Sequence, residues 1–196
     1  RRDHAQAGDV RIPVFQAVRV LRRELAAGAG RHADHHRHEK AIVGFDVVTS
    51  WKGQTRSETK VTGFTLAGER IERSHTIVAD EPCELLGADG APNPQELLMA
   101  AFNACITVGY VAGAALKGIK LEALEIRTRG ELDLRGFLGL DASIAPGYEQ
   151  LDYIVRVAGN GTPDQFEAIH QAVLATSPNY FNLARPIRIN GTLAIG

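Results

Sequence analysis

Cysteine, tryptophan and charge of one sign are all scarce in this chain of 196 residues, which has 2 Cys, 1 Trp and a net charge of −1. Two cysteines are too few for a disulfide-stapled miniprotein, so each thiol raises a question of reactivity instead. The near balance of 22 basic and 23 acidic residues gives no overall attraction to nucleic acid or to an anionic membrane, and we expect neither as a partner. The hydrophobic share of 44% is that of an ordinary globular domain and excludes a disordered chain.

Signals for targeting, cofactors and metals are also missing. No apolar run follows the first four residues, so no secretory signal is predicted and we expect a cytoplasmic protein. The sequence has no glycine-rich phosphate loop and no Ser-His-Asp pattern, and no cofactor is predicted. Four histidines are close together, but no acidic or thiol ligand completes a tetrahedral set at a familiar spacing, so no metal site is predicted. These histidines are His32, His35, His36 and His38.

The chain divides into two parts of different pattern. After Pro13, apolar residues recur at helical spacing as far as Gly28, and a charged, His-rich stretch follows. Residues 1–40 are therefore predicted to form an amphipathic helix and a polar linker. From Ala41 the apolar period changes to two, which indicates strands and marks the start of a core domain over 41–196.

The core domain combines strands with two helices, and its order predicts an α+β fold. An uncharged helix is expected over 97–116. A second helix begins at the capping box Thr162-Pro163-Asp164-Gln165 and is expected to end at Pro178. The expected strands are 43–51, 55–66, 71–78, 124–134, 151–157 and 187–193.

The segment 97–116 is the most distinctive part of the sequence, because it contains no formally charged side chain. About twenty such residues are enough to span a bilayer, but the many small residues together with Asn103 and Thr107 favour a buried central helix. Gly109 and Gly113, four residues apart, would let another backbone approach closely. Six short strands from one chain cover such a helix only partly, so we expect an obligate homodimer built around paired central helices.

Each of the two thiols has its own sequence context. Cys105 lies in the middle of the uncharged helix and is the candidate nucleophile, with a core cysteine that behaves as a small hydrophobe as the alternative. Cys83 lies in the loop "DEPCELLG", where exposure is expected. Its neighbours Asp80, Glu81 and Glu84 are acidic, and nearby carboxylates disfavour a thiolate. Cys83 is therefore the poorer nucleophile and a possible secondary thiol.

The run from Asp80 to Cys105, "DEPCELLGADGAPNPQELLMAAFNAC", resembles the signature of the OsmC/Ohr family of osmotically inducible and organic hydroperoxide resistance proteins. In that family an acidic-Pro loop, a Leu-Gly step, an Asn-Pro or Ser-Pro step and a Glu-Leu-Leu/Phe-Ala-Ala helix lead into a reactive cysteine. The resemblance extends over about residues 41–196 and does not cover 1–40. It implies an OsmC-like fold in which strands of both chains wrap around two long central helices in an intertwined homodimer.

The resemblance also implies a thiol-dependent peroxidase. In that chemistry a cysteine thiolate attacks the O–O bond of a hydroperoxide and becomes a sulfenic acid. A second cysteine condenses with it, and an external dithiol reduces the disulfide. Cys105 falls on the attacking position. Arg56 matches the family arginine that stabilises the thiolate and the departing alkoxide; its alternative is a solvated charge beside Glu58.

Two positions depart from the family pattern. The family glutamate that positions the arginine lies ten residues before the cysteine, where this chain has Gln95, and Glu96 follows on a different side of the helix. The family's resolving cysteine precedes a proline, and the corresponding pair here is Ser177-Pro178, which cannot form a disulfide.

Two functions follow from this comparison. One is a one-cysteine peroxidase that acts on small organic hydroperoxides and is reduced by a small thiol. The other is a non-catalytic dimeric protein that holds an apolar or thiol-reactive ligand beside Cys105.

Overall fold

The computed structural model describes Gln16, Arg19, Arg23 and residues 41–196. The remainder of the predicted N-terminal helix and the His-rich linker lie outside the described residues, so the prediction for 1–40 stays a prediction. The chain divides into two compact units. The first unit extends to Asn93 and includes Ala115–Gly118, and the second contains 94–114 and 119–196.

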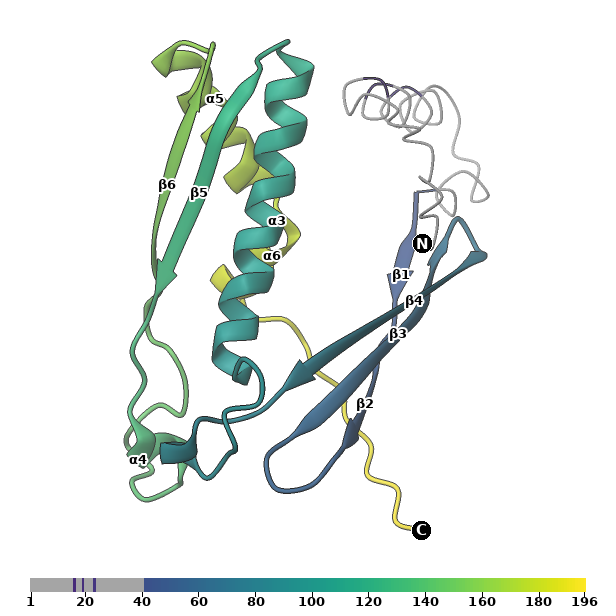
Figure 1. Cartoon of the computed structure of the whole chain (residues 1–196), viewed down its shortest axis with the longest axis vertical. Coiled ribbons are helices and arrows are strands. Elements are labelled where there is room, and N and C mark those ends of the chain that lie inside the picture. Colours follow the sequence, from purple (N-terminus) through teal and green to yellow (C-terminus); the bar gives the residue numbers. More distant parts are fainter. Residues whose placement is uncertain (1–15, 17–18, 20–22, 24–40) are drawn as a thin grey trace, which may run out of the picture. The chain divides into compact units, whose positions relative to one another are not determined.

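The first unit is an antiparallel sheet with strand β3 at its centre (Figure 1). Along one side, β3 pairs with β1 near its end and with β2 near its beginning, and along the other side it pairs with β4. The predicted strands 55–66 and 71–78 are confirmed with shifted ends. The strands are β1 (Val43–Phe45), β2 (Val48–Trp51), β3 (Ser57–Leu66) and β4 (Glu69–Ala79).

The prediction of one continuous strand over 43–51 is wrong, because it is broken between β1 and β2. Phe45 pairs with Phe64, and Val48 pairs with Lys60. Residues 46–47 therefore face residues 61–63, and the extra residue on β3 interrupts the ladder. The β3–β4 pairing shifts register at the same place.

The second unit is built from one long helix, a two-stranded sheet and shorter helices (Figure 1). Strands β5 and β6 pair antiparallel. The core contains a stripe of α3 residues, Phe102, Ile106, Tyr110 and Ala114, packed with Ile169 and Val173 of α5. The elements are α3 (Pro94–Leu116), β5 (Leu121–Arg129), α4 (Leu134–Phe137), β6 (Asp152–Gly159), α5 (Pro163–Thr176) and α6 (Pro178–Ala184).

Helix α3 is buried along this stripe only. Its buried residues recur every four positions, which places them on one side of the helix. Val108, in the middle of the helix, is 68% exposed. Among the helices of the described residues, α3 is the one that is long and apolar enough to cross a membrane by length and composition. Within the part of the chain that the structure describes, much of this apolar helix is therefore uncovered.

Side chains of the same chain, and not another backbone, fill the space beside Gly109 and Gly113 of α3. A Cβ atom added at Gly109 would lie 2.9 Å from Cγ2 of Val173, and one added at Gly113 would lie 3.0 Å from Cγ2 of Ile169. Both partners belong to α5. The small residues thus let α5 pack closely on α3, which corrects the sequence-based expectation.

The predicted strand 124–134 is also corrected, because β5 ends at Arg129. Arg129 is the last residue of β5 that pairs with β6, opposite Asp152, and a strand ends where its partner ends. The alternation of apolar and polar residues continues, but Asp133 accepts a backbone hydrogen bond and caps the short helix α4.

The C-terminal part follows the prediction at its first helix and departs from it afterwards. The capping box at Thr162 is confirmed, with both reciprocal hydrogen bonds present. Pro178 does not simply end that helix, because it opens α6 with Ser177 as the N-cap. The predicted strand 187–193 is wrong, since these residues have no regular secondary structure and Ile189 is 85% exposed. A strand needs a hydrogen-bonding neighbour, and none of the described residues pairs with this segment.

Candidate functional site

Two predicted site residues, Cys105 and Ser177, meet in the second unit. Cys105 is half-buried on α3, and Ser177 lies at the junction of α5 and α6 with 6% of its surface exposed. The Sγ atom of Cys105 lies 3.2 Å from Oγ of Ser177, within hydrogen-bond distance for sulfur. The thiol therefore faces a buried hydroxyl at the position where the resemblance places a second thiol.

Backbone and side-chain hydrogen bonds hold this junction against α3. The Ser177 N–H donates to the Val173 carbonyl at 2.8 Å, which continues the last turn of α5. The Tyr180 N–H donates to Ser177 Oγ at 3.3 Å, so the hydroxyl caps α6. Two residues after Ser177, Asn179 Nδ2 donates to the Ala101 carbonyl of α3 at 2.8 Å. Hydrogen bonds to α5, to α6 and from α6 to α3 thus hold Ser177 in position.

Asn103 links α3 to the sheet on another side. Its Nδ2 donates to the Ile126 carbonyl at 3.3 Å, and its Oδ1 accepts from the Thr128 hydroxyl. Both partners belong to β5. Sequence analysis noted Asn103 only as a polar residue that disfavours a membrane helix. The signal that could have identified this linking role was the position of the amide, two residues before the candidate nucleophile Cys105.

A cavity of about 480 Å³ is lined by neighbours of Cys105 and Ser177, although neither of these two residues lines it. Phe102, one turn before Cys105, and Tyr180, which bonds to Ser177, both line it. Gln95 lines it as well, whereas Glu96 is exposed and is not part of the lining. The other lining residues are Leu98, Gly147, Tyr148, Glu149, Gln150, Leu151, Tyr153, Leu183 and Ala184. The cavity thus offers apolar and phenolic surface among the neighbours of the thiol.

Arg56 and Cys83 belong to the first unit. Arg56 closes the turn between β2 and β3, where its N–H donates to the Gly53 carbonyl. Its Nη2 atom lies 3.7 Å from Oε1 of Glu58, and its side chain is 40% exposed. Cys83 is an exposed free thiol at the start of a short 3-10 helix, Cys83–Leu85. The catalytic roles assigned to these two residues from the sequence stay predictions.

Asp80 organises the loop of the first unit that carries Cys83. Only 2% of Asp80 is exposed, and its carboxylate accepts a hydrogen bond from the Thr55 hydroxyl at 2.7 Å. It also accepts from three backbone N–H groups, those of Glu81, Ala88 and Gly90. These bonds, with Thr55 first, lower the pKa of Asp80 below its ordinary value. Sequence analysis treated Asp80 only as an acidic neighbour of Cys83.

We expect a Thr55→Val substitution to destabilise the protein in a pH-dependent way. A carboxyl group with a lowered folded-state pKa stabilises the fold above its unfolded value of about 3.9. That contribution is lost as the pH falls through the folded-state pKa. The difference in unfolding free energy between wild type and variant should therefore be largest above about pH 5 and shrink towards pH 2. Urea unfolding across this range measures it.

Thr49→Val is the matched control, because the Thr49 hydroxyl bonds to that of Thr59 and to no ionisable group. Its effect on stability should not vary with pH. A Thr55→Val effect that is equally constant would contradict the role assigned to Asp80.

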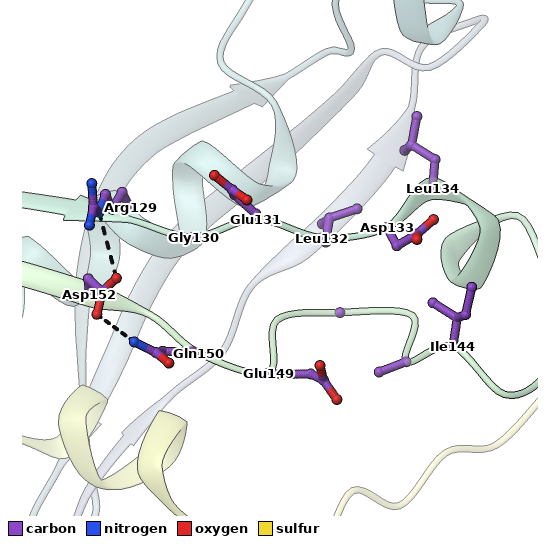
Figure 2. Close-up of a pocket in the computed structure, with 12 residues that line it drawn as sticks. Arg129, Gly130, Glu131, Leu132, Asp133, Leu134, Ile144, Glu149, Gln150 and Asp152 are labelled. Atoms are coloured by element: carbon purple, nitrogen blue, oxygen red, sulfur yellow. Dashed lines mark hydrogen bonds and ion pairs between the residues drawn. The ribbon is translucent and has the colours of Figure 1, made fainter.

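A second, larger hollow lies at the end of the β5–β6 pair and does not include the thiol. Its volume is about 1010 Å³, and its walls are residues 129–134 together with Ile144, Ala145, Gly147, Glu149, Gln150 and Asp152. Figure 2 shows Arg129 and Gln150 both reaching the Asp152 carboxylate, at 3.6 and 2.7 Å. Hydrogen bonds from Arg135 lower the pKa of Asp133 to about 2. Among the described residues, no group of three or more His, Cys, Asp or Glu side chains could hold a metal ion.

Comparisons with known proteins agree on one family. The family model described as OsmC-like protein matches residues 87–191. A comparison with curated proteins gives no significant match. An OsmC-like protein from Mycoplasma pneumoniae has a similar structure, with a TM-score of 0.53 and 13% identity over 71% of this chain and 86% of that chain. An OsmC-like protein of unknown function from Vibrio cholerae gives 0.52 and 15% over 69% and 90%. At such identities these likenesses show the fold.

Proposed function

The chain belongs to the OsmC-like protein family, and on that premise we propose that it is a thiol-dependent peroxidase that reduces small organic hydroperoxides through Cys105. The observation that carries the proposal is the half-buried thiol of Cys105, 3.2 Å from a buried hydroxyl. A cavity of about 480 Å³ is lined by Phe102, one turn of α3 before Cys105. A partly accessible thiol in polar contact suits a reactive cysteine better than a core residue. The cavity offers room for the organic group of a hydroperoxide.

The proposed first step transfers one oxygen atom to sulfur. The Cys105 thiolate attacks the O–O bond, an S–O bond forms, and the O–O bond breaks with release of an alkoxide. The alkoxide takes up a proton and leaves as the alcohol, while Cys105 becomes a sulfenic acid. A small thiol then attacks the sulfenic acid and releases water. A second small thiol restores Cys105 and leaves as the disulfide of the two small thiols.

The reductant in this proposal is a small thiol, because the residue in contact with Cys105 is a serine. Ser177 cannot form a disulfide, so the two-cysteine cycle that the resemblance implies is replaced by a one-cysteine cycle. Arg56 is proposed to stabilise the thiolate and the alkoxide by its charge. Gln95 is proposed to accept a hydrogen bond from that guanidinium, with Glu96 as the acidic residue beside it.

We propose that the protein works as an intertwined homodimer. Support comes from the exposed apolar surface of α3 around Val108, and from the unpaired C-terminal segment, where Ile189 is 85% exposed. Soluble monomers rarely expose contiguous apolar surface of this kind. A second copy that covers α3 would bury more than the ~2,000 Å² typical of obligate dimers. We place the protein in the cytoplasm, where thiols such as Cys83 and Cys105 stay reduced.

The second candidate function is a non-catalytic dimer that binds an apolar or thiol-reactive ligand. It is favoured by Ser177 in place of a resolving thiol and by the uncharged Gln95 in the cavity wall. In this case Cys105 would react with a ligand or line its site without turnover.

A stopped-flow peroxidase assay separates the two functions. The full chain is mixed with cumene hydroperoxide or with hydrogen peroxide, and dithiothreitol or dihydrolipoamide serves as reductant. We expect repeated turnover, faster with cumene hydroperoxide, because the cavity lined by Phe102 and Tyr180 has room for an organic group. Loss of no more than one equivalent of peroxide per chain in the presence of excess thiol would favour the binding function.

A further inference from the structure

We propose that the Ser177 hydroxyl donates a hydrogen bond to the Cys105 thiolate and thereby activates it, a role that deepens the proposed peroxidase function and rests on it. The contact joins Cys105 of α3 to Ser177 between α5 and α6, and the two residues are 72 positions apart in the sequence. Ser177 therefore does more than occupy the place of a missing thiol. It is assigned here as a catalytic residue, because it touches the reacting sulfur.

The direction of this hydrogen bond depends on the ionisation state of Cys105. Ser177 Oγ accepts a hydrogen bond from the Tyr180 N–H at 3.3 Å, which leaves its own hydrogen available. Cys105 Sγ lies 3.2 Å away, and either atom could be the donor while Cys105 is a thiol. A thiolate has no hydrogen, so the hydroxyl must then be the donor.

Ionisation of Cys105 makes this contact stronger. A neutral thiol can donate or accept, but a thiolate can only accept, and hydrogen bonds to ionised groups are about twice as strong as neutral ones. Because Ser177 is 6% exposed, water competes little for the bond. The contact thus stabilises the thiolate more than the thiol, which is what an attacking cysteine requires.

Few other ionisable groups of the second unit face this sulfur. Helix α3 has no charged residue after Glu96, and α6 has none within 178–184. The titratable side chains in or against the core of this unit are Tyr110, Tyr153 and Tyr180, together with His170, which is hydrogen-bonded to Tyr110 at 2.7 Å. The charged residues of β5 and β6, such as Arg127, are exposed. Ser177 is therefore the polar group in direct contact with the sulfur, alongside the proposed charge of Arg56.

The chemistry of the oxygen transfer is unchanged by this role. Ser177 keeps its proton throughout: the sulfur electron pair forms the S–O bond, the O–O bond breaks, and the alkoxide takes its proton from solvent. The resulting sulfenic acid has no thiol beside it, so it persists until a small thiol arrives.

The test measures how fast iodoacetamide alkylates Cys105 as a function of pH, in the full chain and in Ser177→Ala. We expect the pH midpoint of alkylation to rise by about one unit in the variant, equivalent to about 1.4 kcal/mol. The alkylation rate near pH 7 should fall about tenfold. Peptide mapping distinguishes Cys105 from Cys83.

Thr176→Ala is the matched control, because it removes the hydroxyl next to Ser177 in the chain, which bonds to the Ala172 carbonyl and not to Cys105. Its alkylation midpoint should stay at the wild-type value. Coincident midpoints for wild type and Ser177→Ala would overturn the proposal, and so would an equal shift in Thr176→Ala. A shift confined to Ser177→Ala supports it even if the wild type reduces no hydroperoxide, so the two proposals can fail separately.

A second variant tests the contact if Ser177→Ala does not fold. In Ser177→Cys the introduced thiol replaces the hydroxyl that lies 3.2 Å from Cys105 Sγ. We expect the thiol oxidant diamide to join it to Cys105 in a disulfide, detected by peptide mass. Absence of that disulfide in folded protein would show that the two side chains do not meet, and the proposal would be overturned.

Discussion

Hydroperoxide reduction is expected to disappear in a Cys105→Ser variant, with a rate no greater than that of buffer containing the same thiol. A serine hydroxyl is almost entirely protonated near neutral pH and is a far weaker nucleophile than a thiolate. The substitution changes one half-buried atom and preserves the hydrogen-bonding capacity towards Ser177. The fold should therefore survive, which far-UV circular dichroism can confirm. Cys83→Ser is the matched control, because this exposed thiol is outside the second unit, and its activity should be that of wild type.

The product of the first turnover provides an independent check of the same prediction. One equivalent of cumene hydroperoxide without reductant should add the mass of one oxygen atom to Cys105. A small thiol should cap this sulfenic acid, and excess oxidant should convert it to sulfinic acid. Cys83 is an exposed thiol of the first unit, and we expect it not to attack this sulfenic acid. A rapid disulfide between Cys83 and Cys105 would contradict the one-cysteine cycle and make Cys83 the resolving residue.

Dissociation of the proposed dimer is the second large effect that we expect, in a Val108→Asp variant. Val108 is 68% exposed in one chain, in the middle of the most apolar helix. If a second copy covers α3, the substitution places an unpaired carboxylate in an apolar interface. Such a charge costs about 3–5 kcal/mol, which weakens association at least about a hundredfold. Sedimentation at micromolar concentration should show wild-type dimers and dissociated or unfolded Val108→Asp chains.

Ala172→Asp is the matched control, because Ala172 is exposed on α5 and does not belong to α3. It introduces the same charge on a helix surface that the proposal leaves in solvent, and the dimer should persist. A wild-type protein that sediments as a stable folded monomer would refute the dimer itself. Dissociation of both variants alike would show that added charge, not the covered face of α3, is responsible.

The elements that could be predicted from the sequence are those whose signal is local. The capping box at Thr162 needs four consecutive residues, and both of its hydrogen bonds form. The uncharged segment 97–116 lies inside α3, because helical spacing and the absence of breakers act over a few turns. The resemblance around Cys105 identified the family for the same reason, since its motif is one continuous run.

The ends of the strands could not be predicted from a local sequence signal. Alternation continues past Arg129, but β5 stops there because its pairing with β6 ends at Asp152. The segment 187–193 alternates as a strand should, yet no described strand pairs with it. Periodicity reports which side chains would share a face, whereas a strand also requires a neighbour for its backbone hydrogen bonds.

By itself the sequence determined the α+β class, the central helix that carries Cys105, and the serine at position 177 that excludes a disulfide. Only the tertiary structure decided that Ser177 Oγ lies 3.2 Å from Cys105 Sγ. It also decided that the Asp80 carboxylate accepts hydrogen bonds from three backbone N–H groups, and that Val173 fills the space at Gly109. The physical reason is distance along the chain. Propensity and periodicity act between residues a few positions apart, whereas these contacts arise when the burial of apolar surface brings separate elements together.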